Sequence, residues 1–270
     1  MLFYRKKFHY NGDRLMNKSD YRIIFEGMTS VSAIINAIKK GTARRKIYAV
    51  YFEKSKIRKE RGRFSFLKIA SEQIGFELKV VSTEEIAELS SGKTHGGILA
   101  EVSETEYRNI EDEDIPECGF AAIIEGVEDP YSLGYSLRTL YAAGCTNVIL
   151  PHHLPAAADS TLCKASAGAS ELLNIFLGDT AEIASRFKEK GYKIACAAIP
   201  DSLPCYEADL SYPILIVIGG EKRGISSKLL AMKDINVRIP YGIDFMGSLS
   251  TSSAVSILAY EVLRKNISSK

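Results

Sequence analysis

The sequence predicts an α/β protein built around a parallel sheet. Its 270 residues are 46% hydrophobic and 25% charged, as in a soluble globular chain of one large or two modest domains. Short apolar runs alternate with helical patterns, and the run 214–218 is apolar throughout, which is typical of a strand buried on both faces. At three places a strand ends in a loop of small residues that leads directly into a helix.

The first segment, residues 21–105, alternates helical and strand patterns. The patterns predict helices over residues 30–40, 64–74 and 83–89, and strands over residues 46–52 and 76–81. The acidic stretch that follows has neither period, so residues 106–118 are predicted to be a linker. Residues 1–20 are basic and without pattern, and we expect a mobile tail there, with Met16 as an alternative start of translation.

The second segment, residues 119–270, begins with an apolar strand and an Asp-Pro turn. A helix then carries Leu137, Leu140 and Tyr141 on one side and stops at Gly144, before a strand over residues 147–151. Strand 214–218 comes later, and a helix closes the chain. The inward face of this last helix is predicted to contain Ala254, Ile257, Leu258 and Glu261.

Positive charge gathers in one stretch of the first segment. The net charge is only +2, yet ten Lys and Arg residues between positions 44 and 68 are opposed by Glu53 and Glu60 alone. A local positive potential is what contact with nucleic acid phosphates requires, although a solvated helix face is the alternative. The candidates for that contact are Arg44, Arg45, Lys46, Arg58, Arg61 and Arg63.

The loops before the later helices are suited to a ligand. The last helix follows a serine-rich loop, and unpaired N–H groups at a helix start favour polar or anionic groups. The loop after strand 214–218 has Gly219, Gly220 and Gly224, which let the backbone approach a ligand closely, and one carboxylate, Glu221. Taken singly, the last helix is equally well a capped core helix, and the glycine loop is better explained as an ordinary strand-to-helix turn. A lone helical arginine such as Arg138 is usually solvated or salt-bridged.

Together and in this order, the junctions resemble motifs 1, 2 and 3 of the SpoU, or TrmH-like, family of RNA ribose 2′-O-methyltransferases in the SPOUT superfamily. The first is similar to D-P-x-N-x-G-x-x-x-R-T through Asp129, Pro130, Gly134, Arg138 and Thr139. The second is similar to G-x-E-x-x-G through Gly219, Glu221 and Gly224. The third is similar to I-P-M…S-L-N-x-S-x-A through Ile239, Pro240, Ser248, Leu249, Ser252 and Ala254. Residues 164–169 resemble the family's K-A-S-x-G-A segment.

The resemblance implies a parallel-sheet domain with a deep trefoil knot, preceded by a smaller RNA-binding domain related to ribosomal protein L30e, although pattern alone argues against a knot. It implies a homodimer that uses S-adenosylmethionine to methylate a ribose 2′-hydroxyl, in rRNA more than in tRNA. Arg138 would activate the hydroxyl and contact RNA, with Glu221 orienting it and Ser132, Ser248 and Ser250 lining the catalytic site. Cofactor contacts are implied for Gly219, Gly220, Gly224, Ile239, Ser248 and Leu249.

Two departures from the family motifs open an alternative. Ser132 and Ser250 stand where the family usually has asparagine, and a hydroxyl has a shorter reach than an amide and a different hydrogen-bond geometry. The chain is therefore either an enzyme fitted to its own substrate or a catalytically weak RNA-binding relative. A nucleotide-binding oxidoreductase is disfavoured, because the G-x-G-x-x-G fingerprint is missing.

The cysteines and histidines predict neither disulfides nor a metal site. The five cysteines are odd in number and have no C-x-x-C spacing, so we expect reduced, mostly buried thiols. The four histidines form no ligand set with nearby acids. No apolar run is long enough to span a bilayer and no signal-peptide core is present, so we expect a cytoplasmic protein.

Overall fold

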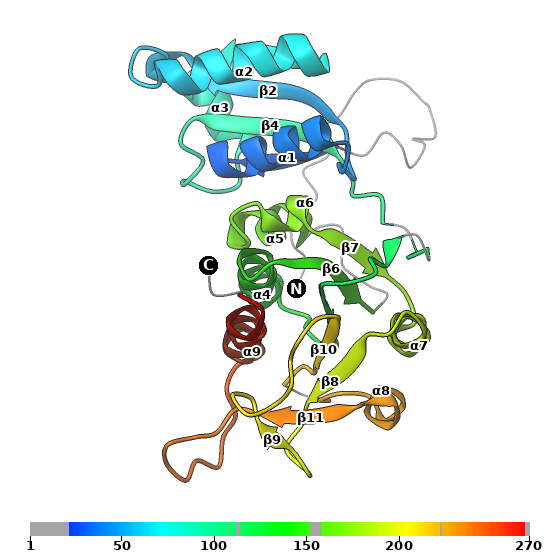
Figure 1. Cartoon of the computed structure of the whole chain (residues 1–270). Helices are drawn as coiled ribbons and strands as arrows, with labels where there is room; N and C mark the ends of the chain where they lie inside the picture. The colour runs from blue at the N-terminus through cyan, green and yellow to red at the C-terminus, as the bar shows by residue number, and fades with distance from the viewer. Residues whose placement is uncertain (1–21, 108, 112–113, 152–157, 222, 268–270) are drawn as a thin grey trace, which may run out of the picture.

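The computed structural model describes residues 22–107, 109–111, 114–151, 158–221 and 223–267 (Figure 1). The chain forms two α/β domains, each with its own sheet, and one lies above the other in Figure 1. The tail expected at residues 1–20 lies outside the described residues.

The N-terminal domain, residues 22–103, is a four-stranded sheet in the order β1-β4-β2-β3. Its elements are β1 (Arg22–Glu26), α1 (Met28–Lys40), β2 (Ile47–Glu53), η2 (Lys54–Lys56), α2 (Arg61–Ile74), β3 (Glu77–Val81), α3 (Thr83–Leu89) and β4 (Ile98–Ser103). The predicted helices and strands are therefore confirmed with small shifts of their ends. Ser82 caps α3 by accepting a hydrogen bond from the Glu85 N–H, and Gly41 ends α1 at φ 72°.

The C-terminal domain contains a seven-stranded sheet in the order β7-β6-β5-β10-β8-β11-β9, and every pairing is parallel. Its strands are β5 (Phe120–Ile124), β6 (Cys145–Leu150), β7 (Asn174–Leu177), β8 (Lys193–Ala197), β9 (Leu203–Pro204), β10 (Ile214–Ile218) and β11 (Ile235–Arg238). Its helices are α4 (Pro130–Ala142), α5 (Asp159–Ala165), α6 (Ala169–Leu172), α7 (Thr180–Glu189), α8 (Ser227–Met232) and α9 (Thr251–Asn266). The predicted parallel α/β fold is confirmed, and β10 is buried along its whole length.

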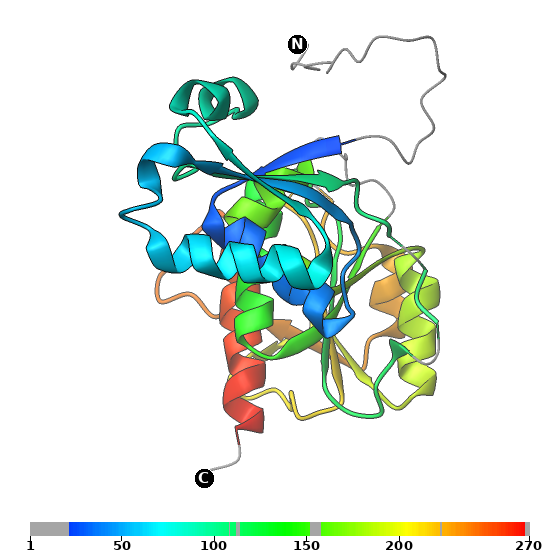
Figure 2. The ribbon, with the colours of Figure 1, turned by 90° about the horizontal axis from the view of Figure 1, so that it is seen from above.

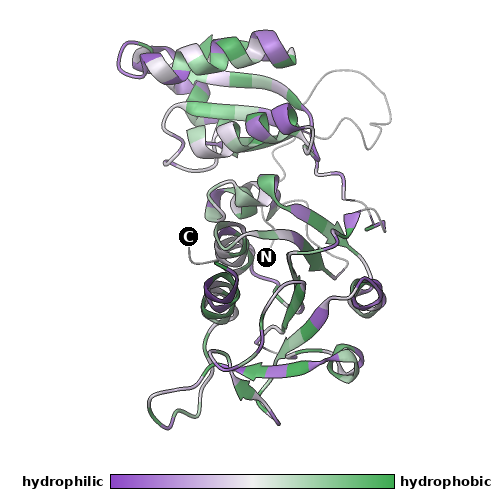
Figure 3. Cartoon of the chain, in the orientation of Figure 1, coloured by the Kyte–Doolittle hydropathy of each residue, from purple (hydrophilic) through white to green (hydrophobic). Residues whose placement is uncertain are grey.

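Helices cover both faces of this sheet. Leu137 of α4 and Leu258 of α9 pack on one face, and Phe187 of α7 and Leu229 of α8 pack on the other. Figure 1 shows the two pairs on opposite sides of the strands, and Figure 3 shows apolar residues in β10 between them. Successive residues of β10 alternate between the two clusters, which is why its sequence is apolar throughout.

The inward faces of two helices differ from the prediction. The buried apolar residues of α9 are Val255, Leu258, Ala259 and Val262. Ile257 is 37% exposed, and Tyr141 of α4 is 39% exposed. Because α4 and α9 pack side by side as well as on the sheet, each helix is rotated away from the single stripe expected from its sequence. The knot that the resemblance implies stays a prediction.

The two domains meet through helices. Seen from above, the N-terminal domain lies across the C-terminal domain (Figure 2). Helix α1 contacts α5 and α6, and β1 contacts α5. The fully buried Cys163 of α5 belongs to the hydrophobic cluster of the N-terminal domain, so the core of that domain is completed by a residue from the second half of the chain.

Candidate active site

The carboxyl ends of β5 and β10 lie side by side at one edge of the parallel sheet. Ile124 pairs with Ile218, and the N–H of Glu125 donates to the carbonyl of Ile218 at 2.9 Å. The loops that follow these strands therefore start at the same place. Ligands of parallel α/β sheets bind at this edge.

Glycines bring the two loops into backbone contact. A Cβ on Gly220 would overlap the carbonyl oxygen of Gly126. Gly126 itself has a positive φ of 69°, which favours glycine at that position. A Cβ on Gly219 would overlap the backbone of Gly224, whose N–H donates to the carbonyl of Gly220 at 3.0 Å. Glycine is required at these positions because the backbones of the loops lie so close together that no side chain fits between them.

The start of α9 is anchored to the same loop. Ser250 is its N-cap, with Oγ accepting a hydrogen bond from the Ser253 N–H at 3.2 Å. The buried hydroxyl of Thr251 donates to the carbonyl of Gly219 at 3.5 Å. Ser250 thus has a capping role of its own, which asparagine also fills well.

The start of α4 lies next to these loops and to the start of α9. The carboxylate of Asp129 accepts a hydrogen bond from the Ser132 N–H at 2.7 Å, and Pro130 occupies the first turn. This hydrogen bond to the Ser132 backbone holds the pKa of Asp129 below its ordinary value. Further along α4, a Cβ on Gly134 would lie 2.5 Å from the Cβ of Ala165, so glycine lets α4 pack tightly on α5.

These three helix and loop starts enclose a pocket of about 430 Å³. Its lining residues are Gly126, Val127, Glu128, Asp129, Pro130, Ser132, Glu221 and Thr251. The pocket thus unites residues of all three sequence motifs, from Asp129 to Thr251, which are 122 positions apart. Three of its side chains are carboxylic acids, and no cationic side chain lines it among the described residues.

Other predicted site residues lie outside this lining. Arg138 is exposed on α4, beyond Ser132 by more than one turn. Ser248 lies in an exposed loop over residues 241–250, where the Leu249 N–H donates to the hydroxyl of Tyr241 at 3.1 Å. Ile239 is half-buried against the core below that loop.

A carboxylate that the sequence did not single out supports the pocket. Glu125 follows β5 directly and accepts hydrogen bonds from the Thr180 hydroxyl at 2.6 Å and from the Ser226 N–H at 2.7 Å. It therefore joins the end of β5 to the starts of α7 and α8. An acidic residue directly after an apolar strand is the sequence signal that could have indicated it.

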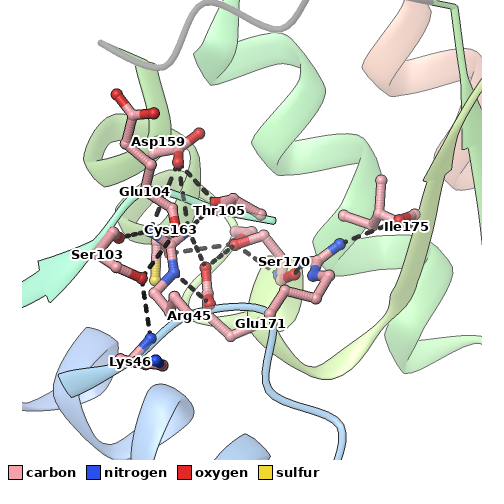
Figure 4. A network of polar contacts seen from close by, with 12 residues as sticks. Arg45, Lys46, Ser103, Glu104, Thr105, Asp159, Cys163, Ser170, Glu171 and Ile175 are labelled. Carbon is pink, nitrogen blue, oxygen red and sulfur yellow. Dashed lines mark hydrogen bonds and ion pairs between the residues drawn. The ribbon is translucent and has the colours of Figure 1, made fainter. Parts of the chain in front are cut away.

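The basic stretch divides into buried and exposed members. Arg45 is 6% exposed and pairs with Glu171 and Asp159 (Figure 4), and the Arg44 guanidinium donates to the carbonyl of Ser170. The expectation that Arg44 and Arg45 contact RNA is corrected, because their guanidinium groups are engaged between the domains. The remaining candidates are exposed, and they are Lys46, Arg58, Arg61 and Arg63.

The burial of the cysteines matches the prediction of mostly buried thiols. All five are free thiols, and only Cys118 is exposed. Within the described ranges, no three His, Cys, Asp or Glu side chains gather in a way that would hold a metal ion. None of the helices in the part of the chain described has the length and apolar character that a membrane crossing requires.

Comparison with known proteins gives two family matches. The model of the SpoU rRNA Methylase family matches residues 119–260, more than half of the chain. The model described as RNA 2′-O ribose methyltransferase substrate binding matches residues 26–108. The two matches fall on the two domains of the fold.

Individual relatives agree with these matches. A Staphylococcus haemolyticus protein assigned to the TrmH family of tRNA/rRNA methyltransferases is 32% identical over 177 residues, 63% of this chain and 71% of the relative. The AdoMet-bound rRNA methyltransferase of Sinorhizobium meliloti has a TM-score of 0.74 at 19% identity, covering 92% of this chain and 88% of that one. A structure of an RNA 2′-O ribose methyltransferase has a TM-score of 0.69 at 22% identity, covering 92% and 90%. With the ordered motifs meeting at one pocket, these matches show that the chain belongs to the SpoU rRNA methylase family.

Proposed function

We propose that this protein uses S-adenosylmethionine to methylate a ribose 2′-hydroxyl of structured RNA in the cytoplasm, rRNA in preference to tRNA. The observation that carries the proposal is the pocket in which the start of α4, the loop after β10 and the start of α9 meet. Membership of the SpoU family supports the class of reaction, and the matched substrate-binding model supports RNA as the substrate.

The chemistry of the pocket fits the cofactor. S-adenosylmethionine supplies a methyl group on a positively charged sulfonium, and its methionine part adds an ammonium group. Glu128, Asp129 and Glu221 place carboxylates around the pocket, and opposite charges attract. The tight backbone at Gly219 and Gly220 holds the loop after β10 against the loop after β5, which places Glu221 in the pocket lining.

Arg138 serves the RNA rather than the cofactor in this proposal. An arginine side chain is a cation with several N–H donors, so Arg138 acts by binding phosphate and by stabilising negative charge on the attacking oxygen. It is exposed and lies on the helix whose first turn, at Ser132, lines the pocket. Lys46, Arg58, Arg61 and Arg63 extend the positive surface over the N-terminal domain.

A homodimer belongs to the same proposal. Helices α4 and α9 pack together, and their outer sides expose Tyr131, Tyr135, Ile257 and Tyr260, at 55%, 51%, 37% and 65%. Apolar and aromatic side chains gathered on adjacent helices are typical of a protein interface. Pairing through this face would bring a second copy close to Arg138.

Calorimetric titration tests the cofactor site. S-adenosylmethionine and S-adenosylhomocysteine should bind at micromolar concentration, corresponding to about −8 kcal/mol. Arg138→Ala should bind both ligands as tightly as the parent protein does, but it should lose methyl transfer to RNA. Mapping of 2′-O-methyl groups in rRNA and tRNA then measures this transfer. If the folded protein binds neither ligand at millimolar concentration, the proposal that it is a methyltransferase is refuted.

The second candidate is a catalytically weak RNA-binding relative. The observation that favours it is the pair of serines, Ser132 in the pocket lining and Ser250 at the cap of α9. Replacing both by asparagine separates the candidates. A large gain in methylation supports a decayed site, whereas a loss supports serines fitted to their own substrate.

A further inference from the structure

One segment of the C-terminal domain, residues 159–171, holds the N-terminal domain in place. It comprises α5, the turn after it and most of α6, and we call it the docking segment. Cys163 of this segment is completely buried among N-terminal core residues such as Val31 and Ile34. Gly168 has φ +87°, and a Cβ there would overlap the Cβ of Ala33 in α1. The segment and α1 are therefore packed without room for a larger residue.

A buried ion cluster joins the docking segment to the start of β2 (Figure 4). Arg45 donates from Nε to one carboxylate oxygen of Glu171 at 2.9 Å and from Nη2 to the other at 3.1 Å. The same guanidinium lies 3.4 Å from Asp159, which also accepts from the Thr105 hydroxyl at 2.6 Å. The side chains of Arg45, Glu171 and Asp159 are only 2%, 3% and 4% exposed.

Further contacts surround this cluster. Arg44 donates to the backbone carbonyls of Ser170 and Ile175. In the middle of the segment, next to the buried Cys163, Lys164 pairs with Glu26 at 3.3 Å, and Glu26 in turn accepts from the N–H of Gly92 at 2.9 Å. The interface is thus bonded at both ends of the segment through Arg45, and bonded and packed in its middle.

The opposite side of the docking segment packs on α4, the helix of motif 1. A Cβ on Gly134 would lie 2.5 Å from the Cβ of Ala165 and 3.0 Å from the N atom of Ser166. Ser132 of α4 lines the pocket, so the docking segment connects the pocket helix on one side to α1 of the N-terminal domain on the other.

We propose that Arg45 and the docking segment fix the N-terminal domain at one distance from the pocket, and that this distance selects the nucleotide that is methylated. The proposal rests on the proposed function, in which the N-terminal domain binds the RNA. Arg45 is a positioning residue, because it does not line the cofactor pocket and its side chain is buried in the ion cluster between the domains.

The physical reason is the cost of burying charge. Buried carboxylates and a buried guanidinium lose their hydration, and only complete pairing with good geometry compensates for that loss. The two parallel N–H···O bonds of Arg45 to Glu171 also fix the relative orientation of the two groups. A small displacement of one domain would leave charges buried and unpaired, so the interface favours one arrangement.

The test compares Arg45→Met with a matched control, Arg22→Met. Arg22 also pairs with a glutamate, Glu101 at 2.5 Å, but within the N-terminal domain and with 52% of its side chain exposed. Arg45→Lys is the milder variant, since it keeps the charge and loses the two-pronged geometry. Circular dichroism and S-adenosylmethionine titration confirm that each variant is folded and binds cofactor.

Two readouts decide the proposal. The first is the distance between spin labels at Glu72→Cys on α2 and Glu189→Cys on α7, in a Cys118→Ser background. The second is the position of 2′-O-methyl groups on the RNA substrate. The parent protein and Arg22→Met should give one narrow distance and one methylated nucleotide.

In Arg45→Met, and to a smaller extent in Arg45→Lys, the distance distribution should broaden and methyl groups should appear at neighbouring nucleotides. The cofactor affinity of each variant should stay within about twofold of the parent's. This corresponds to less than about 0.5 kcal/mol of binding free energy, since a tenfold change corresponds to about 1.4 kcal/mol. A distance that stays narrow, or a broadened distance with unchanged nucleotide choice, overturns the proposal. If the parent methylates no RNA, the proposed function and nucleotide selection both fail, while the distance measurement still decides whether Arg45 fixes the domains.

Discussion

Glu125 shows how one residue can support the pocket without lining it. Its carboxylate accepts hydrogen bonds from Thr180 and Ser226, so Glu125→Gln would place an amide NH₂ against groups that already donate. A mispaired polar group costs about 1 to 3 kcal/mol when it is buried, and Glu125 is half-buried, so the lower end of this range applies. We expect the cofactor affinity to fall about tenfold, corresponding to about 1.4 kcal/mol. Calorimetric titration measures it, with the exposed Glu182→Gln on α7 as control. Equal affinities in the two variants would contradict the role of Glu125.

The thiols should separate into one reactive and four unreactive groups. Burial raises the pKa of Cys163 to about 12 and that of Cys196 to about 11. Only the thiolate reacts with iodoacetamide, so buried thiols stay protonated and inert while pH is well below these values. At about pH 8, intact mass should show one rapid addition, absent in Cys118→Ser, and four more only in denaturant. Rapid reaction at a second thiol in the folded protein would be inconsistent with this burial.

At the scale of elements, the packing of α4 on α5 depends on a glycine. A Cβ at Gly134 meets Ala165 at 2.5 Å, so Gly134→Ala must push the helices apart. Overpacking of this kind costs about 1 to 3 kcal/mol of unfolding free energy. Gly62→Ala in α2 is the matched control: its Cβ meets nothing within 4 Å, and alanine should stabilise the helix by about 0.5 to 1 kcal/mol. Urea unfolding measures both, and opposite signs are expected.

Long elements were predictable from sequence because their own residues determine them. The helical patterns at residues 30–40 and 64–74 match α1 and α2 in the structure. The short α5, α6 and β9 were not predicted, since elements of so few residues depend on their neighbours more than on their own periodicity. The rotation of α9 was also missed, because it packs against α4 as well as the sheet.

The candidate site was predictable to a different degree. The order of the three motifs indicated residues that the structure unites, such as Ser132 and Glu221, whereas Thr251 of the lining was not indicated. The local excess of positive charge gave a wrong prediction for Arg45, because a basic run has the same sequence whether its side chains face solvent or a buried carboxylate. The partners of Arg45 lie 126 and 114 positions away, and no local pattern connects residues at that separation.

For the molecule as a whole, acid should weaken the contact between the domains. Burial alone would raise the pKa of Glu26, but hydrogen bonds from Gly92 and Ser91 and the nearby Lys164 outweigh burial and lower it. A carboxyl with a lowered folded pKa contributes stability above its ordinary pKa, and this is lost as pH falls through the lowered value. Unfolding free energy from about pH 7 to pH 3 should therefore fall less in Glu26→Gln than in the parent.

The matched control is Glu72→Gln on the exposed side of α2. Its unfolding free energy should follow the parent across the same pH range. If Glu26→Gln also follows the parent, the ion pair with Lys164 does not contribute to acid sensitivity.

The contribution of Cys163 to the N-terminal core has a consequence for biosynthesis. The sheet of that domain is complete once Ser103 has left the ribosome, yet one of its core positions is filled only when residue 163 has emerged. The central strand β10 comes later still, although it pairs with β5 at Phe120. The nascent chain thus carries an N-terminal domain with an open core until residue 163 has emerged, and a β5 with β6 as its only neighbour until β10 has emerged.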